Sequence, residues 1–261
     1  MLLKDKVVII SGIGPGLGIE LSTLAAREGA RGVAVAARTA SKLDDAEAAI
    51  RAAGLDTVVL KVPTDVADRA QCERLVERTV AAFGRIDALV NSAYVPGQFG
   101  PVESADLDDW QGILDVNLFG TLKLTQAVIP VMKKQRGGAI VMISSMITRK
   151  PMAHQGGYAM SKAALTGATA QLALELARYG IRVNTAYMGW MWGPPVESYV
   201  EYAVSQGMDR DAVIGDITKD IPLGIIPDDA DCANAVAFLA SDLASVITGA
   251  ELNVNGGEFM L

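Results

Sequence analysis

Short runs of apolar residues alternate with longer amphipathic segments from one end of the chain to the other. The runs are rich in β-branched residues and nearly continuous in apolar character, which is typical of strands covered by helices on both faces. This alternation predicts a Rossmann-like, doubly wound α/β sheet of about seven parallel strands with right-handed crossovers. The expected strands are Lys6–Ser11, Val33–Ala37, Thr57–Val62, Ala88–Asn91, Ala139–Ile143, Arg182–Ala186 and Glu251–Val254.

Residues with capping preferences bound two of the segments between the strands. Ser41 precedes a helical pattern that Gly54 ends, and Asp68 precedes one that Gly84 ends. No linker, low-complexity tract or internal repeat divides the chain. Because α/β folds of this length commonly form one unit, we expect a single domain over residues 1–261.

Composition narrows the classes of partner. The formal net charge is -7, whereas a nucleic-acid surface needs clustered Lys and Arg, so no nucleic-acid partner is expected. No run approaches the roughly 18 apolar residues of a membrane span, and the start MLLKDKVVII lacks the pattern of a signal peptide. The two cysteines, Cys72 and Cys232, are far apart and have no nearby His or Cys. We therefore expect no metal, no disulfide and a cytoplasmic setting.

A glycine-rich turn follows the first expected strand. Gly12, Gly16 and Gly18 fit the spacing G-x-x-x-G-x-G, and no register fits the common G-x-G-x-x-G. Such a turn lets the backbone approach a pyrophosphate, and the helix that follows, from about Leu17, presents N–H donors and a positive dipole end. An ordinary glycine-rich turn is the alternative, but the position between strand and helix favours a dinucleotide.

The end of the second expected strand bears on the choice of dinucleotide. In NAD-binding units an acid near this point holds the ribose 2′-hydroxyl. Here the strand runs into Arg38 and Thr39 instead. Because a guanidinium pairs bidentately with a phosphate, NADP(H) is favoured. The alternative is NAD(H), with Arg38 solvated or stacked on the adenine.

A tyrosine and a lysine four residues apart suggest acid–base chemistry. Tyr158 and Lys162 lie in a helical pattern, and residues at this spacing share one helix face. A free tyrosine titrates at about pH 10, and a neighbouring ammonium lowers the pKa of a phenol. The pair alone is a weak signal, but upstream the expected strand from Gly138 ends in the hydroxyls of Ser144 and Ser145.

Taken together, the order of these motifs resembles the short-chain dehydrogenase/reductase family over essentially the whole chain. The family's TGxxxGxG corresponds to SGIGPGLG, its N-N-A-G to Asn91–Tyr94 and its Y-x-x-x-K to Tyr158–Lys162. The resemblance implies an oxidoreductase that moves a hydride between a nicotinamide and a small-molecule carbonyl or secondary alcohol, and a homotetramer. The catalytic residues that it implies are Asn117, Ser145, Tyr158 and Lys162.

The resemblance also implies roles for these residues. Ser145 and Tyr158 would bond the substrate oxygen, Lys162 the ribose hydroxyls, and Asn117 a water molecule. Asp65 and Val66 would contact the adenine, Asn91 and Ala93 the ribose and nicotinamide side, and Met191 the carboxamide. The implied cofactor-binding residues are Gly12, Gly16, Leu17, Gly18, Arg38, Thr39, Asp65, Val66, Asn91, Ala93, Tyr158, Lys162, Gly189 and Met191.

Three positions depart from the family pattern. Pro15 replaces a residue that is basic in many NADP-preferring relatives, which leaves Arg38 and Thr39 to bind a 2′-phosphate. Tyr94 replaces the last glycine of N-N-A-G and places a phenol near the mouth of the site. Gly193 replaces a threonine whose hydroxyl contacts the cofactor phosphate, so that contact is in doubt.

The region of about residues 190–225 is expected to cover the substrate. It is rich in tryptophan, methionine and tyrosine, and it has no lysine or arginine between Gly189 and Asp209. This composition favours an apolar, fairly bulky substrate over a strongly anionic one. The candidate substrate contacts are Tyr94, His154, Trp190 and Trp192. For His154 the alternative is an exposed loop residue, and for the tryptophans plain packing.

Two other functions compete with this interpretation of the whole chain. They are a non-catalytic nucleotide-binding protein and a strictly NAD-dependent alcohol dehydrogenase.

Overall fold

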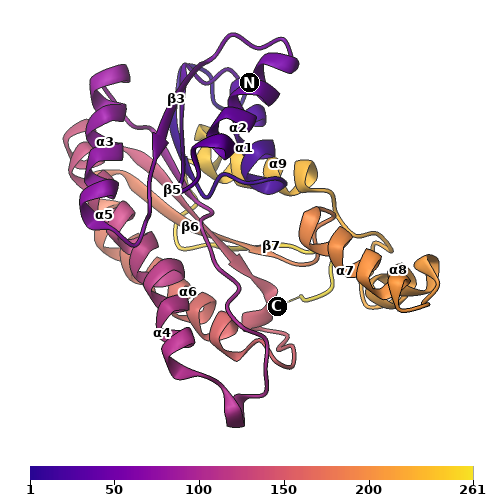
Figure 1. The fold of residues 1–261 in the computed structure, drawn as a ribbon. Helices are drawn as coiled ribbons and strands as arrows, with labels where there is room; N and C mark the ends of the chain where they lie inside the picture. Colours follow the sequence, from indigo (N-terminus) through magenta and orange to yellow (C-terminus); the bar gives the residue numbers. More distant parts are fainter. Residues whose placement is uncertain (261) are drawn as a thin grey trace.

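The structure, a computed structural model, describes residues 1–260 and is built on one seven-stranded sheet (Figure 1). The strand order is β3-β2-β1-β4-β5-β6-β7, and every neighbouring pair is parallel. The strands are β1 (Val7–Ser11), β2 (Gly32–Ala37), β3 (Val58–Pro63), β4 (Ala88–Asn91), β5 (Gly138–Ser145), β6 (Ile181–Met188) and β7 (Glu251–Val254). All seven expected strands are confirmed; β5 extends through the expected serines to Ser145, and β6 runs further at its carboxyl end than expected.

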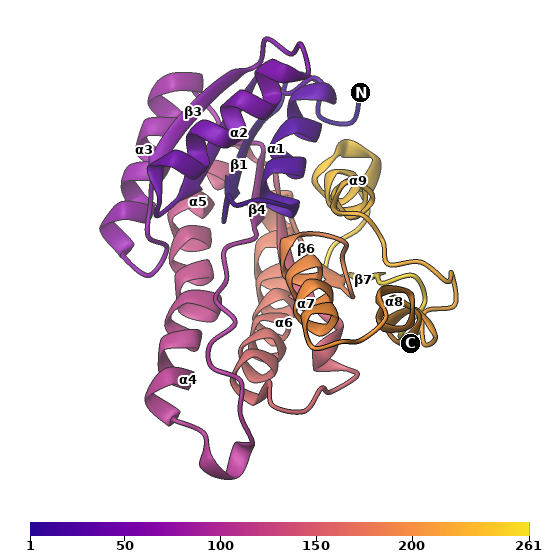
Figure 2. The same ribbon diagram turned by 45° about the vertical axis from the view of Figure 1, so that its right-hand side comes forward.

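Helices cover both faces of this sheet (Figures 1 and 2). One face carries α1 (Leu17–Arg27), α2 (Ala40–Ala52) and α9 (Asp229–Ala240). The other carries α3 (Arg69–Phe83), α5 (Thr121–Gln135) and α6 (Gly156–Leu176). The short α4 (Leu107–Leu114) continues through a π-helical turn, Asp115–Gly120, into α5. The expected doubly wound architecture is therefore confirmed.

In the central strand β1, every residue from Val7 to Ile10 is apolar because each face of the sheet packs on helices. In β1, Val8 and Ile10 belong to the apolar cluster on the α1 side, while Ile9 belongs to the cluster on the α5 side. All three are almost completely buried. Alternating side chains point to opposite faces of a strand, so burial on both faces requires a continuous apolar run.

The helix ends match one sequence expectation and contradict another. The Asp68 carboxylate caps α3 by accepting a hydrogen bond from the Gln71 N–H, and Gly84 ends that helix with a φ of 79°. The expected cap at Ser41 is wrong, because α2 already begins at Ala40, the residue before Ser41. The N-cap is Thr39, whose side chain makes no capping hydrogen bond. Only Arg38 and Thr39 separate β2 from α2, so the chain enters the helix sooner than the serine suggests.

Two helices stand apart from the layers. α7 (Pro194–Ser205) and α8 (Arg210–Thr218) project to one side of the sheet, beyond the carboxyl end of β6 (Figures 1 and 2). They bury a small apolar cluster of their own, which includes Val200 and Val213. Within residues 1–260 no helix has the length and apolar character needed to cross a membrane.

The strand order reverses between β1 and β4. β1 pairs with β2 on one side and with β4 on the other. The helices that follow β1 and β2 lie on one face of the sheet, and those that follow β4 and β5 lie on the other. In open α/β sheets ligands bind in the crevice that such a reversal leaves at the carboxyl ends of the strands. The register places Ser11 of β1 beside Asn91 of β4 at that end.

Candidate active site

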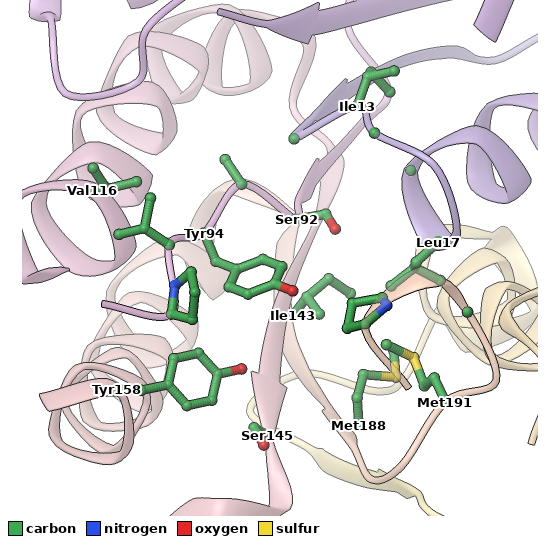
Figure 3. Close-up of a pocket in the computed structure, with 18 of the residues that line it drawn as sticks. Ile13, Leu17, Ser92, Tyr94, Val116, Ile143, Ser145, Tyr158, Met188 and Met191 are labelled. Atoms are coloured by element: carbon green, nitrogen blue, oxygen red, sulfur yellow. The ribbon is translucent and has the colours of Figure 1, made fainter. Parts of the chain in front are cut away.

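A cavity of about 540 Å³ opens at the carboxyl ends of the central strands (Figure 3). It is lined by residues at or just beyond the ends of four strands: Gly12 after β1, Ser92 after β4, Ser145 in β5 and Met188 in β6. The cavity therefore lies at the reversal of strand order, where the sheet topology predicts a ligand site.

The glycine-rich turn forms one wall of the cavity. Gly12 and Gly16 have φ values of 84° and 93°, which favour glycine. A Cβ at Gly12 would lie 2.3 Å from the Ala93 backbone nitrogen, and one at Gly18 would lie 2.7 Å from the Gly12 oxygen. α1 begins directly after this turn, so its free N–H groups face the cavity wall. This cradle fits the pyrophosphate of a dinucleotide.

Another part of the cavity carries two cations, Arg38 and Lys42. Arg38 lines it together with Thr39, Asp65 and Val66, which are also candidate cofactor contacts. Lys42, in the first turn of α2, lines it too, and a Cβ at Gly14 would lie 3.9 Å from its Nζ. Arg38 and Lys42 are exposed and form no ion pair within residues 1–260.

The phenol and hydroxyl expected to do the chemistry meet in the middle of the cavity. Tyr158 projects from α6 and Ser145 from the end of β5, and both side chains point into the same space (Figure 3). Lys162, one helical turn after Tyr158, is buried behind them. Its Nζ donates a hydrogen bond to the Ile143 carbonyl at 2.8 Å and lies 5.8 Å from the Tyr158 ring centroid.

Burial dominates the titration of this pair. It raises the pKa of Tyr158 above its usual range; the nearby Tyr94 raises it further, and a hydrogen bond from Ser145 lowers it. Burial also lowers the pKa of the Lys162 ammonium to about 8. The sequence predicts that Lys162 lowers the pKa of Tyr158, but in this structure the net shift is upward, because burial of the phenol is its largest cause. Tyr158 is therefore a neutral phenol at neutral pH.

Tyr94 adds a second phenol to the cavity. Its ring centroid lies 6.0 Å from that of Tyr158, with the planes inclined at 57°, and the Lys162 Nζ lies 5.7 Å from the Tyr94 centroid. Burial and the charge of Asp229 raise the pKa of Tyr94. Figure 3 shows both phenols directed toward the open centre of the cavity. The expected place of Tyr94 at the site is thus found.

Two asparagines take supporting positions instead of lining the cavity. Asn117, in the π-helical turn, accepts a hydrogen bond from the Val95 N–H and donates to the Val95 carbonyl and the Ser161 hydroxyl. The Asn91 side chain donates to the Thr125 hydroxyl. Asn117 thereby ties the segment after Tyr94 to α6. The structure does not bring either side chain to the cavity surface, and Gly16 also lies just behind it.

The substrate candidates divide into two groups. Trp190 lines the cavity together with Gly189 and Met191. Trp192 does not: it faces a separate hollow beside α8, because its backbone pairs with the segment before α9 and turns its side chain away.

His154 is also absent from the cavity. It is exposed, with a φ of 68°, in the loop before α6, where its carbonyl accepts a hydrogen bond from Gly100. Its loop neighbours Met152 and Gln155 line the cavity instead. The expectation that His154 and Trp192 form the site is therefore corrected.

Known proteins are similar to this chain over nearly all of its length. The family model described as enoyl-(acyl carrier protein) reductase matches residues 12–258. This chain belongs to the short-chain dehydrogenase/reductase family. It is 36% identical to a 3-oxoacyl-(acyl-carrier-protein) reductase of Thermotoga maritima, over 98% of this chain and 99% of the relative. It is 32% identical to levodione reductase of Leifsonia aquatica, over 97% of this chain and 94% of the relative.

Solved structures of the family have the same fold. A crystal structure of levodione reductase superposes with a TM-score of 0.91 at 31% identity, covering 98% of each chain. The structure of an NAD⁺-bound xylitol dehydrogenase gives 0.89 at 30% identity, covering 98% of this chain and 100% of the other. As a short-chain dehydrogenase/reductase, the protein is an oxidoreductase that acts on CH–OH groups with a nicotinamide dinucleotide.

Two charged residues of the cavity were not predicted from the sequence. Lys42 was detectable, since it lies four residues after Arg38 at the start of a helix that follows the second strand. Asp229 lines the cavity from the first residue of α9. No local pattern marks Asp229, because it is brought to the glycine-rich turn only by the packing of α9 beside α1.

Proposed function

We propose that this protein is an NADP(H)-dependent carbonyl reductase that takes apolar substrates and that the whole chain forms one catalytic domain. The observation that carries the proposal is the convergence, in one cavity, of the glycine-rich turn with the Tyr158 and Ser145 hydroxyls. A dinucleotide cradle and a proton donor that face the same space are what hydride transfer to a carbonyl requires.

The protein's own residues supply the positioning and the proton. When bound, the nicotinamide supplies the hydride. The Ser145 hydroxyl donates a hydrogen bond to the carbonyl oxygen of the substrate and holds it beside the Tyr158 hydroxyl. Because the pKa of Tyr158 is raised, the phenol is protonated at neutral pH and donates its proton to the oxygen as the alcohol forms. Lys162 holds the ribose hydroxyls, and Asn117 keeps the wall behind Tyr94 in place.

The preference for NADP(H) rests on Arg38 and Lys42. Both cations are exposed at the same end of the cavity and have no ion-pair partner within residues 1–260, so both are available to a 2′-phosphate. No acid stands at the end of β2 to hold a free 2′-hydroxyl. The Thr39 hydroxyl, which makes no capping bond to α2, is a third donor at that end.

The substrate class follows from the other end of the cavity. The residues there are mostly apolar: Val95, Pro96, Ile147, Met152, Met188, Trp190 and Val196. Trp190 is held from behind by Tyr199, at a centroid distance of 6.2 Å. We propose that residues 190–225 form the cover, with α7 and α8 moving as one unit on their shared apolar cluster. An apolar ketone fits such a lining better than a charged keto acid.

We also propose that the chain forms a homotetramer. Apolar side chains on α4, on α6 and in the π-helical turn before α5 are left exposed, among them Leu107 at 69%, Phe119 at 45% and Leu174 at 76%. The region 107–135 with α6 would form one interface. The C-terminal segment, of which residues 251–260 are described, would form the other beside the free edge of β7; Leu261 lies outside the described residues.

Replacement of Tyr158 by phenylalanine tests the mechanism. Tyr158→Phe keeps the ring and removes the proton donor, so kcat should fall at least ~100-fold while the dinucleotide still binds. Steady-state kinetics and cofactor fluorescence measure the two quantities. Tyr94→Phe, which removes the other phenol of the cavity, serves as the comparison and should change kcat by less than ~10-fold. Near-normal turnover in a folded Tyr158→Phe variant would contradict the assignment.

Replacement of the two cations tests the choice of cofactor. Arg38→Ala and Lys42→Ala should each weaken NADPH binding by roughly 10- to 100-fold and leave NADH binding nearly unchanged, because only NADPH carries the 2′-phosphate. Ala37→Asp should shift the preference toward NADH. Arg51→Ala on the same helix is the control, since Arg51 lies away from the cavity. Equal losses for both dinucleotides would show that these cations do not contact the 2′ position.

A series of ketones of increasing apolar size tests the substrate class. We expect kcat/KM to rise with chain length or ring size and to be lowest for small keto acids, because the lining offers apolar contact and no lysine or arginine lies in the sequence between Gly189 and Asp209. Trp190→Ala should reduce kcat/KM most for the largest ketones. The proposal is wrong if small charged keto acids are the best substrates.

Light scattering tests the assembly. At micromolar concentration we expect a mass four times that of the chain, since the exposed apolar side chains on α4, α6 and the π-helical turn would be buried between subunits. Leu174→Glu places a charge on that surface and should yield smaller species that remain folded by circular dichroism. A monomeric wild-type protein would rule out the tetramer.

A further inference from the structure

The amino ends of three helices meet at the wall of the cavity, with one carboxyl group between them. α1, α7 and α9 begin at Leu17, Pro194 and Asp229. A Cβ at Gly16 would lie 2.5 Å from the Asp229 Oδ2, and one at Gly193 would lie 2.3 Å from it. The carboxyl oxygen is therefore packed directly against the N-cap glycines of α1 and α7, and Asp229 lines the cavity.

Among residues 1–260 this carboxyl group has no partner. Asp229 is 8% exposed, and it forms no side-chain hydrogen bond or ion pair within residues 1–260. Burying an unpaired carboxylate is costly, so a buried acid in this position favours its neutral form. An unpartnered group facing a ligand cavity is available to a ligand.

The charged groups around Asp229 are all acidic. Glu20 faces it from α1, Glu197 from α7 and Asp228 from the residue before α9. Burial first, and then these three carboxylates, raise its pKa to about 6. Across the cavity it faces the neutral phenol of Tyr94. The positive dipole ends of α1, α7 and α9 favour the ionised form, whereas burial and the three negative charges favour the neutral one, and the pKa is raised.

A thiol and a second acid are the other titratable groups on α9. Cys232 is buried, and burial and the neighbouring acids raise its pKa to about 12, so it stays neutral as Asp229 titrates. Asp231 is exposed in the first turn of the helix. The sole histidine, His154, is exposed and does not line the cavity.

The location of the carboxyl group conflicts with a bound pyrophosphate unless a proton is present. The start of α1 and the glycine-rich turn are the anion-binding elements of this cavity, and Asp229 packs against Gly16 within them. An ionised carboxylate there would repel a pyrophosphate, because Asp229 is buried and the two negative charges would lie close together. A protonated carboxyl would instead donate a charge-assisted hydrogen bond to a phosphate oxygen.

We propose that Asp229 is a proton-linked ligand of the cofactor pyrophosphate: the carboxyl takes up one proton as the dinucleotide binds, and its hydroxyl donates to a phosphate oxygen. This inference rests on the dinucleotide site proposed above and adds a ligand and a pH dependence to it. It assigns to Asp229 the hydroxyl contact that Gly193, without a side chain, does not make.

The sign of the pH dependence follows from the linkage. The bound pyrophosphate raises the pKa of Asp229 above its free value of about 6. Binding is therefore tightest below pH 6, where the carboxyl is already protonated. Above it the Kd increases by about tenfold for each pH unit, until the pKa of the bound state is reached.

Calorimetric titration measures the proton directly. NADH is the main probe, because the 2′-phosphate of NADPH itself titrates at about pH 6. Titrations at pH 7.5 in two buffers of different ionisation enthalpy should show close to one proton taken up per NADH bound by the wild-type protein. Asp229→Asn should take up none. Asp231→Asn, an exposed acid in the first turn of the same helix, is the matched control and should behave as the wild type.

The variants also separate hydrogen bonding from repulsion. Asp229→Asn keeps a donor and does not titrate, so at pH 8 it should bind NADH roughly 10- to 100-fold more tightly than the wild type and about equally at pH 5.5. Asp229→Ala should be equally independent of pH but about tenfold weaker than Asp229→Asn at every pH. Equal affinities of these two variants would overturn the hydroxyl contact.

Thermal unfolding without cofactor tests the protonation itself. The folded-state pKa of Asp229 lies above the ordinary value of 3.8. The wild type should therefore lose Tm relative to Asp229→Asn as pH rises from about 4 through 6. An Asp229→Asn variant that keeps the wild-type pH dependence of NADH binding would overturn the inference. If dinucleotides bind without proton uptake, this inference alone falls; if none binds at any pH, the proposed function falls with it.

Discussion

The contact between Gly12 and the backbone at Ala93 is the constraint on which the site depends. It joins the end of β1 to the end of β4 at the point where the strand order reverses, and it leaves no room for a side chain at residue 12. This close approach holds the glycine-rich turn beside the segment that carries Tyr94, and Asn117 ties that segment to α6. The cofactor cradle and the Tyr158 hydroxyl are thereby placed on opposite sides of one cavity.

Water exclusion from this cavity sets the charge states of its groups. The same burial that keeps Tyr158 a neutral phenol also lowers the pKa of Lys162 and raises that of Asp229. In each case the desolvation of a charged form is the largest cause. The charge states of the site therefore depend on how closely the cavity walls pack. A change at α7 that lets water reach these groups shifts all three pKa values toward their ordinary values.

Sequence patterns predicted those parts of the site whose positions are set within a single strand or helix. The strands were predictable because burial on both faces demands continuous apolar runs, and Tyr158 and Lys162 because one helix face brings them together. Trp192 was misplaced because a backbone pairing with Asp228, distant in sequence, turns its side chain away. Asp229 went unpredicted for the same reason, since only the packing of α9 on α1 brings it to Gly16. Long-range packing has no signature in a single sequence.

The packing of Asp229 against Gly193 makes these two positions mutationally interdependent. The Oδ2 atom occupies the space into which a Cβ at residue 193 would project, at 2.3 Å, although the extended backbone there permits any residue. Substitutions at positions in direct contact do not contribute additively to stability. A side chain at residue 193 therefore requires the Asp229 carboxyl, the free end of a flexible side chain, to turn away from its present position. The residue at position 193 thus influences where the carboxyl at position 229 lies relative to the start of α1.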